Sequence, residues 1–142
     1  MPSLDPHVMR RLVSEARVGR LVTIDADGRP NPVPFVFAVE GDVLVSAVDR
    51  KPKRSRDLRR LANVRDRPDV AVLVDHYQED WERIWWVRVR GRGRVVEDGP
   101  ERDKALATLA EKYPRYRDDP PDGPALLIEI ADWRGWSARS IQ

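Results

Sequence analysis

The sequence contains no cysteine among its 142 residues. Disulfides, thiolate nucleophiles and sulfur-ligated metals are therefore excluded, and this absence fits a reducing, cytosolic compartment. Histidine is scarce too: His7 and His76 each lack a second histidine at metal-ligand spacing, so no metal site is expected. We expect His7 to be a solvated helix residue. His76, at an expected strand end, is kept as a candidate for lining a pocket.

Long apolar runs are also missing. The N-terminal residues lack the apolar core of a signal peptide, and no segment approaches the roughly 18 apolar residues of a membrane span. We therefore predict a cytoplasmic protein with no membrane partner.

The common catalytic motifs are absent as well. No serine stands in a nucleophile elbow, and no glycine-rich phosphate loop follows an expected strand. The acidic residues around Tyr77 and Trp81 are explained by a solvated loop, without a paired-carboxylate site. Hydrolytic and metal-assisted chemistry are thus poorly supported. An enzyme with this sequence would take its reactivity from a bound cofactor, which the protein would hold and orient.

The composition that is present, 41% hydrophobic and 35% charged residues, predicts one globular domain over residues 1–142. An aspartate N-cap followed by proline starts a helix at Asp5, and Gly19 is a plausible stop. Residues 20–49 contain three short β-rich runs separated by glycine turns, which indicates an antiparallel meander. Prolines in the second run place its start at a sheet edge or bulge.

The later elements alternate between helix and strand patterns. We first expect a basic helix at 54–62, with Leu58 and Leu61 facing inward, and a strand at 69–77 that is buried on both faces. A long strand at 83–98 follows, with a bend or bulge at Gly91 and Gly93. The last elements are a helix at 100–113, a polar loop at 114–124 and a strand at 125–133. Six or more strands with three peripheral helices predict a mainly β protein, a closed or partly closed β-barrel.

Positive charge is concentrated in one segment, although the formal net charge is only +2. Nine lysines and arginines lie between residues 50 and 67, opposed there only by Asp57 and Asp66. A solvated helix face, a nucleic-acid site and a site for an anionic small molecule all remain open. No nucleic-acid motif is visible, so we expect no nucleic-acid partner. We favour the anionic small molecule because a strand end feeding a helix offers N–H donors beside the cations.

Two adjacent tryptophans on one expected strand, Trp85 and Trp86, must point to opposite faces of the sheet. One is expected in the core, and the other must meet a ligand, a partner subunit or solvent. Trp133 and Trp136 are expected to make packing or dimer contacts.

The order of elements, together with "KPKR…LRRLANVR…P" and "DHYQEDWERIWWVRVRG", resembles the pyridoxamine 5′-phosphate oxidase-like split-barrel superfamily. Its actinobacterial branch of deazaflavin (coenzyme F420)-dependent oxidoreductases is the more similar one. The resemblance covers nearly the whole chain. It implies a split β-barrel of the FMN-binding type, and a homodimer that binds flavin or deazaflavin between its subunits.

The resemblance also implies cofactor contacts, which group by position in the chain. The cofactor ring would be flanked by Pro34, Phe35 and Val36, and the ring or ribityl chain would lie along Ser46, Ala47 and Val48. The phosphate would be bound by Lys51, Lys53 and Arg54, with Arg56 nearby. The dimer mate would contribute Trp85, Trp86 and Arg88. His76 completes the set as a pocket residue and, with Tyr77, as a candidate proton donor. No catalytic residue is assigned.

F420 carries a phosphodiester and a polyglutamate tail, so the basic segment, with Arg59 or Arg60 added, suits it better than FMN. The resulting prediction is hydride transfer between reduced F420 and a small conjugated or heteroaromatic substrate. The alternatives are an FMN-dependent oxidoreductase and a non-catalytic F420 carrier. Vitamin B6 oxidation is not expected, because the C-terminal "WRGWSARSIQ" has no histidine.

Overall fold

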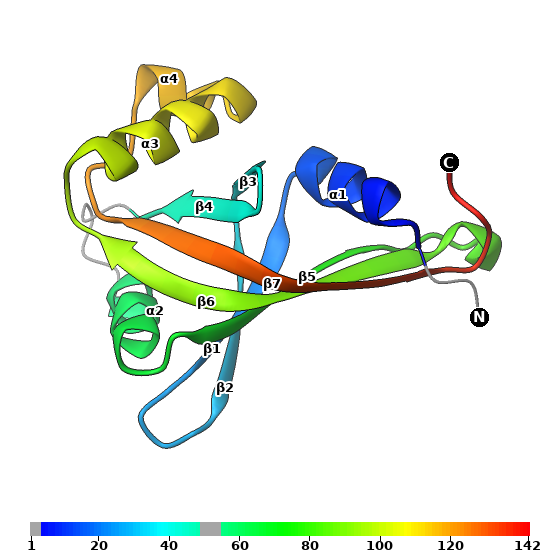
Figure 1. The fold of residues 1–142 in the computed structure, drawn as a ribbon, viewed down its shortest axis with the longest axis horizontal. Helices are drawn as coiled ribbons and strands as arrows, with labels where there is room; N and C mark the ends of the chain where they lie inside the picture. The colour runs from blue at the N-terminus through cyan, green and yellow to red at the C-terminus, as the bar shows by residue number, and fades with distance from the viewer. Residues whose placement is uncertain (1–3, 49–54) are drawn as a thin grey trace.

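The structure is a computed structural model that describes residues 4–48 and 55–142. Within these residues it is mainly β, as predicted: seven strands form one antiparallel sheet in the order β2-β1-β5-β6-β7-β4-β3, with helices around it (Figure 1). The elements are α1 (Pro6–Glu15), β1 (Gly19–Ile24), β2 (Pro30–Phe35), β3 (Ala38–Glu40), β4 (Val43–Ala47), α2 (Ser55–Asp66), β5 (Asp69–His76), the 3₁₀ turn η1 (Trp81–Arg83), β6 (Trp85–Val96), α3 (Pro100–Lys112), α4 (Arg115–Asp118) and β7 (Ala125–Ser137).

The first helix begins as its capping residues predict. The Asp5 carboxylate accepts a hydrogen bond from the His7 backbone N–H at 2.9 Å, and Pro6 occupies the first helical position. The helix ends at Glu15 because Ala16 adopts an extended backbone. Gly19, the expected stop, already begins β1.

The predicted three-run meander is wrong, because residues 20–47 form two separate hairpins. The second run is broken after Phe35, so β2 pairs only with β1 and β3 pairs only with β4. These two strands occupy opposite edges of the sheet. The edge position predicted for the prolines is confirmed. Pro30, Pro32 and Pro34 alternate along β2, and an edge strand has one side that needs no N–H donors.

Burial corrects two further predictions. In β5, Val70, Val72 and Val74 are buried, but Leu73 on the other face is 37% exposed, so this chain covers only one face of the strand. In α2, Leu61 is buried whereas Leu58 is 49% exposed. The helix packs on the sheet through Leu61 and Val64, and Leu58 lies one turn before that contact.

The long strand β6 carries the predicted irregularity, a register shift between Arg90 and Gly91 against β7. β6 and β7 are the two long, curved strands at the centre of the sheet in Figure 1. β7 ends at Ser137, four residues beyond the end predicted at residue 133. The polar loop expected at 114–124 contains a short helix, α4. Its turns are closed by bonds such as Arg117 N–H to Pro114 C=O at 3.0 Å.

Two apolar clusters hold the elements together. The main core lies between α1 and the sheet and includes Val13, Leu21 and Phe37, each 0% exposed. A smaller cluster joins α3 to β4 and β7 and includes Ala47 and Leu109. Among the described residues, no helix has the length and apolar character needed to cross a membrane.

Candidate functional site

A hydrogen bond joins two of the predicted cofactor regions. The Ser46 hydroxyl on β4 donates to the Val36 carbonyl at 2.8 Å, which ties the link between β2 and β3 to the neighbouring hairpin strand. Val36 is half-buried and Pro34 is exposed, whereas Phe35 is buried and stacks on Phe37 with ring centroids 5.2 Å apart. The surface available to a ligand on this stretch therefore comes from Pro34 and Val36.

The same link is held from its other side by the end of α3. Lys112 Nζ donates to the Phe37 carbonyl at 2.8 Å, and the Tyr113 hydroxyl lies 2.9 Å from that carbonyl and 3.2 Å from the Phe37 N–H. Burial lowers the pKa of Lys112 to about 8, with a smaller contribution from the positive charge of Arg17. The backbone at Val36–Phe37 is thus held by three side chains and does not need a ligand to order it.

The end of β4 leads toward the basic segment. Ser46, Ala47 and Val48 are all buried, with exposures of 2%, 8% and 4%. Val48 N–H and C=O bond the backbone of Pro124 and Gly123, at 3.2 and 2.9 Å. These contacts fix the point from which the chain continues toward α2.

The residues predicted to bind phosphate lie outside the described residues. Lys51, Lys53 and Arg54 fall in the segment 49–54, and for Arg56 only the backbone is described, within α2. Their assignment to the cofactor phosphate stays a prediction.

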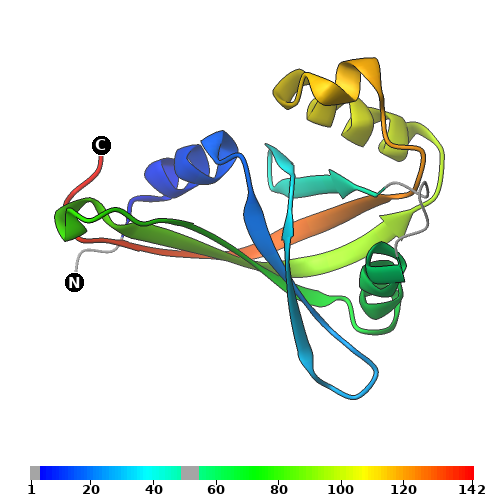
Figure 2. The same ribbon diagram turned by 180° about the vertical axis from the view of Figure 1, so that it is seen from behind.

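A cation-lined groove lies between α2 and the β1–β2 hairpin. It has a volume of about 240 Å³, and Figure 2 shows the hairpin extending beside α2. We call it the α2 groove; it is lined by Thr23, Asn31, Pro32, Val33, Arg59, Arg60 and Asn63. Among the described lining residues the charged groups are the guanidinium groups of Arg59 and Arg60, which suit phosphate or carboxylate oxygens.

The walls of the α2 groove are internally bonded. The buried Asn63 amide donates to the Thr23 hydroxyl at 3.0 Å, joining α2 to β1. The Asn31 amide donates to Asp25 at 3.1 Å, and Asp25 also accepts from the N–H groups of Arg29 and Asp27 at 2.9 Å each. The Arg29 N–H, followed by the Asn31 amide, lowers the pKa of Asp25.

Sequence reasoning included Arg59 and Arg60 but missed Thr23, Asn31 and Asn63. The available signal was Asn63, an amide at an inward position of an otherwise charged and apolar helix. Its partner on β1 is distant in sequence and could not be inferred from the pattern.

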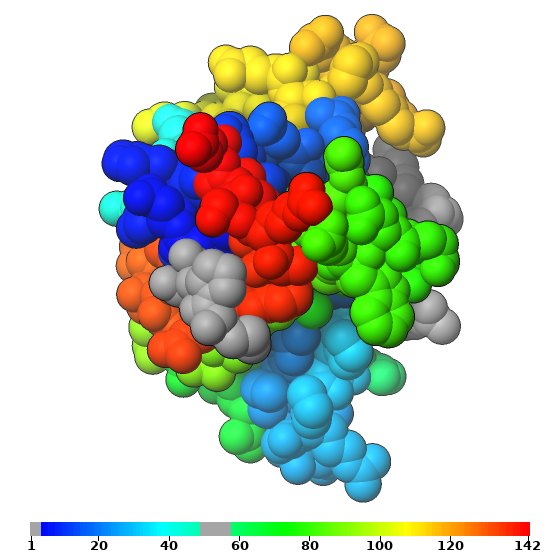
Figure 3. Space-filling view, turned by 90° about the vertical axis from the view of Figure 1, so that its right-hand side faces the viewer, coloured from blue at the N-terminus to red at the C-terminus, as the bar shows by residue number. Residues whose placement is uncertain are grey.

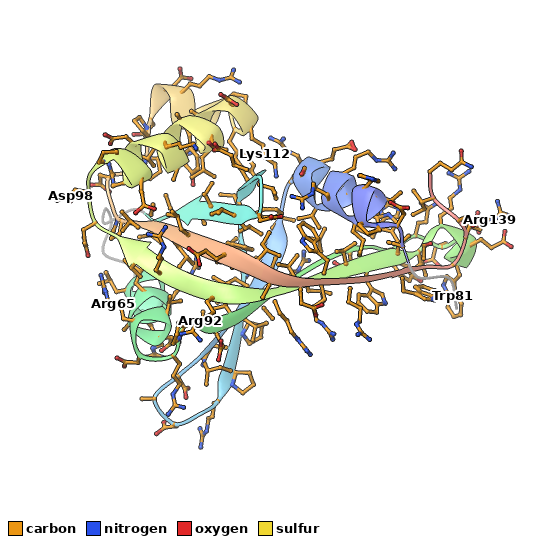
Figure 4. The ribbon with its side chains drawn as sticks, viewed as in Figure 1. Arg65, Trp81, Arg92, Asp98, Lys112 and Arg139 are labelled. Carbon is orange, nitrogen blue, oxygen red and sulfur yellow. The ribbon has the colours of Figure 1, made fainter. Side chains whose placement is uncertain are left out.

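The remaining predicted residues lie elsewhere. Trp85 packs against the main core and stacks on His76 with ring centroids 6.0 Å apart. Trp86 and Arg88 alternate with it and face the opposite side of the sheet, as predicted for adjacent strand residues. His76 and Trp85 lie at the end of the molecule marked by Trp81 and Arg139, and the α2 end is marked by Arg65 (Figure 4). A single chain therefore does not bring them to the Val36–Ser46 region.

The face that carries Trp86 and Arg88 has buried polar atoms left over. Arg88 is level with Arg134 on β7, and Trp86 with Trp136. The Arg88 Nε and Trp136 Nε1 atoms are buried and have no hydrogen-bond partner among the described residues. Within those residues, no cluster of histidine and carboxylate side chains could hold a metal.

Solved structures place this arrangement in a known fold. A conserved hypothetical protein from Mycobacterium tuberculosis has 19% identity and a TM-score of 0.78, covering 96% of this chain and 86% of that one. A FAD-binding protein from Mycobacterium smegmatis has 21% identity and a TM-score of 0.65, with coverages of 95% and 97%. A heme-binding protein from the same organism has 15% identity and a TM-score of 0.67, with coverages of 92% and 56%.

Sequence comparison gives the family directly. No curated protein matches this sequence. The family model described as pyridoxamine 5′-phosphate oxidase matches residues 6–137, nearly the whole chain. The predicted resemblance to the split-barrel superfamily is thereby confirmed: the chain belongs to the pyridoxamine 5′-phosphate oxidase family.

Proposed function

We propose that this protein is a homodimeric oxidoreductase that binds F420, in preference to FMN, and acts on a small conjugated or heteroaromatic substrate. The observation that carries the proposal is the α2 groove, a hollow that is lined by Arg59 and Arg60 and has no carboxylate among its described lining residues. The bound deazaflavin would supply the hydride, and this chain would supply binding, orientation and exclusion of water.

Charge favours F420 over FMN. Lys51, Lys53 and Arg54 suffice for one phosphate, which FMN also carries. Arg59 and Arg60 follow on α2 and line a hollow with room for additional anionic groups. A ligand that continues from a phosphate into several carboxylates would use both sets of cations.

The proposed orientation of the ring depends on the rigid Val36–Phe37 link. Ser46 holds this backbone from one side, and Lys112 and Tyr113 hold it from the other. A ring placed against Pro34 and Val36 would meet a surface already in its final position, which reduces the ordering cost of binding.

The homodimer is proposed because one chain leaves the predicted site in two halves. Trp86 and Arg88 lie on a sheet face with unsatisfied buried polar atoms, away from Ser46 and the α2 groove. A second copy would cover this face and bring its Trp86 and Arg88 toward the first copy's cofactor, as the family resemblance implies, whereas Trp85 packs against the core of its own chain.

The FMN alternative rests on the similar FAD-binding protein from M. smegmatis, and the carrier alternative on the absence of an assigned catalytic residue. A titration distinguishes the three. We expect F420 to quench tryptophan fluorescence with a clearly lower dissociation constant than FMN at moderate salt. A lower constant for FMN would transfer the protein to the flavin-dependent alternative. Tight F420 binding without turnover across conjugated acceptors would identify a carrier.

Two sets of variants test the phosphate and tail contacts separately. Replacing Lys51, Lys53 and Arg54 together by alanine should weaken F420 and FMN binding alike, by several kcal/mol, since a hydrogen bond to a charged group contributes roughly 1.5–3 kcal/mol. Arg59→Ala/Arg60→Ala should weaken F420 at least about tenfold more than FMN. The control, Arg115→Ala/Arg117→Ala, removes the same charge from α4. Unchanged dissociation constants in the triple variant would overturn the phosphate assignment and leave the fold intact.

A further inference from the structure

A second hollow lies at the opposite end of the molecule from the α2 groove. It has a volume of about 340 Å³, within the usual range for small-molecule pockets. Residues 76–85, between and including the ends of β5 and β6, form one wall, and residues 137–141 after β7 form the other. In Figure 3, which views this end directly, the C-terminal residues in red lie against the green loop. We call this hollow the tip pocket.

Backbone bonds hold the two walls of the tip pocket together. The Ala138 N–H donates to the Ile84 carbonyl at 3.0 Å, which joins the C-terminal segment to the loop. The Ser137 hydroxyl donates to the Arg139 carbonyl, and the Arg139 guanidinium pairs with Glu82 across the pocket. The pocket is therefore a built feature of the fold, closed by contacts between distant parts of the chain.

One side of the pocket is aromatic. His76 and Trp85 stack with an interplanar angle of 18°, and both line the hollow. Tyr77 and Trp81 on the same loop are 61% and 68% exposed, and the Trp81 indole N–H donates to the Tyr77 hydroxyl at 3.3 Å. Of these four rings, His76 and Trp85 line the pocket, and a flat apolar ligand would find its stacking surface on them.

Hydrogen-bonding groups in the pocket are partly fixed. His76 Nε2 lies 2.8 Å from the Gln78 amide oxygen, and an amide oxygen only accepts. In the tautomer that carries its hydrogen on Nε2, His76 donates to this oxygen and presents Nδ1 as an acceptor. The Gln78 amide N–H₂ keeps its role as a donor.

The charges that line the pocket are one carboxylate and two guanidinium groups. Glu82 is paired with Arg139. Arg83 Nε lies 3.6 Å from Asp80, longer than a hydrogen bond, so the Arg83 guanidinium keeps donors for a further acceptor. Both guanidinium groups thus have a carboxylate partner, and Arg83 offers an acidic group its remaining N–H donors.

We propose that the tip pocket binds a small planar aromatic molecule that bears one acidic group, with the ring against Trp85 and His76 and the acid on Arg83. This inference rests on the pocket alone and does not require the proposed cofactor. It assigns His76, which its strand-end position made a candidate cofactor contact, to a different pocket.

The test uses naphthalene-2-carboxylate as the probe and naphthalene-2-carboxamide as its neutral counterpart, with the full chain and no cofactor. We expect the acid to bind at least about tenfold more tightly than the amide. Backbone amide signals of Gln78 and Ser140 should shift in NMR spectra during the titration. Arg83→Gln should remove the preference for the acid, whereas Arg134→Gln, an exposed arginine on β7, should leave it unchanged.

Two results would overturn the proposal. Equal affinities for acid and amide would show that Arg83 does not recognise the acidic group. Shifts confined to residues outside 76–85 and 137–141 would show that the probe binds elsewhere. Because no cofactor is present, either result would leave the F420 proposal intact, and failure of the F420 titration would leave the tip pocket intact.

Discussion

Lys112 shows how one residue can be essential to local geometry and still cost stability. Its ammonium lies 4.3 Å from the Phe37 ring centre and donates to the Phe37 carbonyl. Both contacts favour the charged form, but half-burial opposes it and lowers the pKa to about 8. The buried ammonium should therefore leave a measurable trace in the pH dependence of stability.

The first prediction concerns that pH dependence. Between pH 8 and 10.5 the folded protein releases the Lys112 proton while the unfolded chain retains it, so stability should rise with pH across this window. Below pH 8 both states are protonated and the rise is absent. Urea unfolding at pH 7.5 and 10, compared with Lys112→Met, should show an extra gain in the wild type on the order of 1 kcal/mol after solvent screening. An identical difference between the two proteins at both pH values would contradict the assignment.

The second prediction concerns Gly91, at the bulge between β6 and β7. A Cβ atom there would lie 2.3 Å from the Glu129 carbonyl oxygen and 2.9 Å from the Ile128 side chain. Because the blocking atom is backbone, the strands would have to separate, and we expect Gly91→Ala to lower the free energy of unfolding by at least about 2 kcal/mol.

Gly28→Ala is the matched control for Gly91→Ala. At Gly28 a Cβ would meet no atom within 4 Å, but φ is +80°, so the cost should be about 1 kcal/mol, from backbone strain alone. Chemical unfolding of both variants measures the comparison. An equal or smaller loss for Gly91→Ala would show that the bulge can widen freely.

At the scale of elements, local chemistry predicted starts and interruptions well. The Asp5 cap, the Gly99–Pro100 start of α3 and the irregularity at Gly91 all follow from neighbouring residues. Pairing partners did not follow in this way. β2 and β3 are separated by two residues, yet they lie at opposite edges of the sheet, because each is bonded only to its own hairpin partner.

In the α2 helix, too, the sequence predicted local features of the candidate site but not its long-range contacts. Its basic character and its inward Leu61 could be read from the sequence, whereas the exposure of Leu58 could not. The α2 groove depends on Asn63 reaching Thr23, 40 residues away in the chain. Local patterns therefore located the cations, and long-range packing decided which groups stand opposite them.

At the scale of the whole molecule, the most informative feature is the sheet face that the described residues leave uncovered. It carries Leu73, Trp86 and Arg88, together with the buried, unbonded Nε1 of Trp136. The apolar run of β5 predicted burial on both of its faces. One chain buries only the valine face, so a second copy is the proposed cover for the other.

The third prediction tests whether a second copy of the chain covers this face. Leu73→Arg should shift the protein from dimer to monomer in sedimentation equilibrium, because a charge on the proposed interface would be desolvated without a partner. The control is Leu58→Arg, a second exposed leucine placed on α2 away from that face, which should leave the dimer unchanged. A wild type that stays monomeric at high concentration would contradict the proposed homodimer, as would a dimer insensitive to Leu73→Arg.

The sequence by itself determined the family, the mainly β architecture and the place where positive charge gathers, because these depend on residue order, local propensity and composition. Tertiary structure alone decided the position of β3 at the sheet edge opposite β2, the makeup of the α2 groove and the existence of the tip pocket. Each of these brings together residues far apart in the chain: Thr23 with Asn63, and Ile84 with Ala138. Local patterns do not encode such distances. These long-range contacts form when the apolar faces of the sheet and helices are buried together.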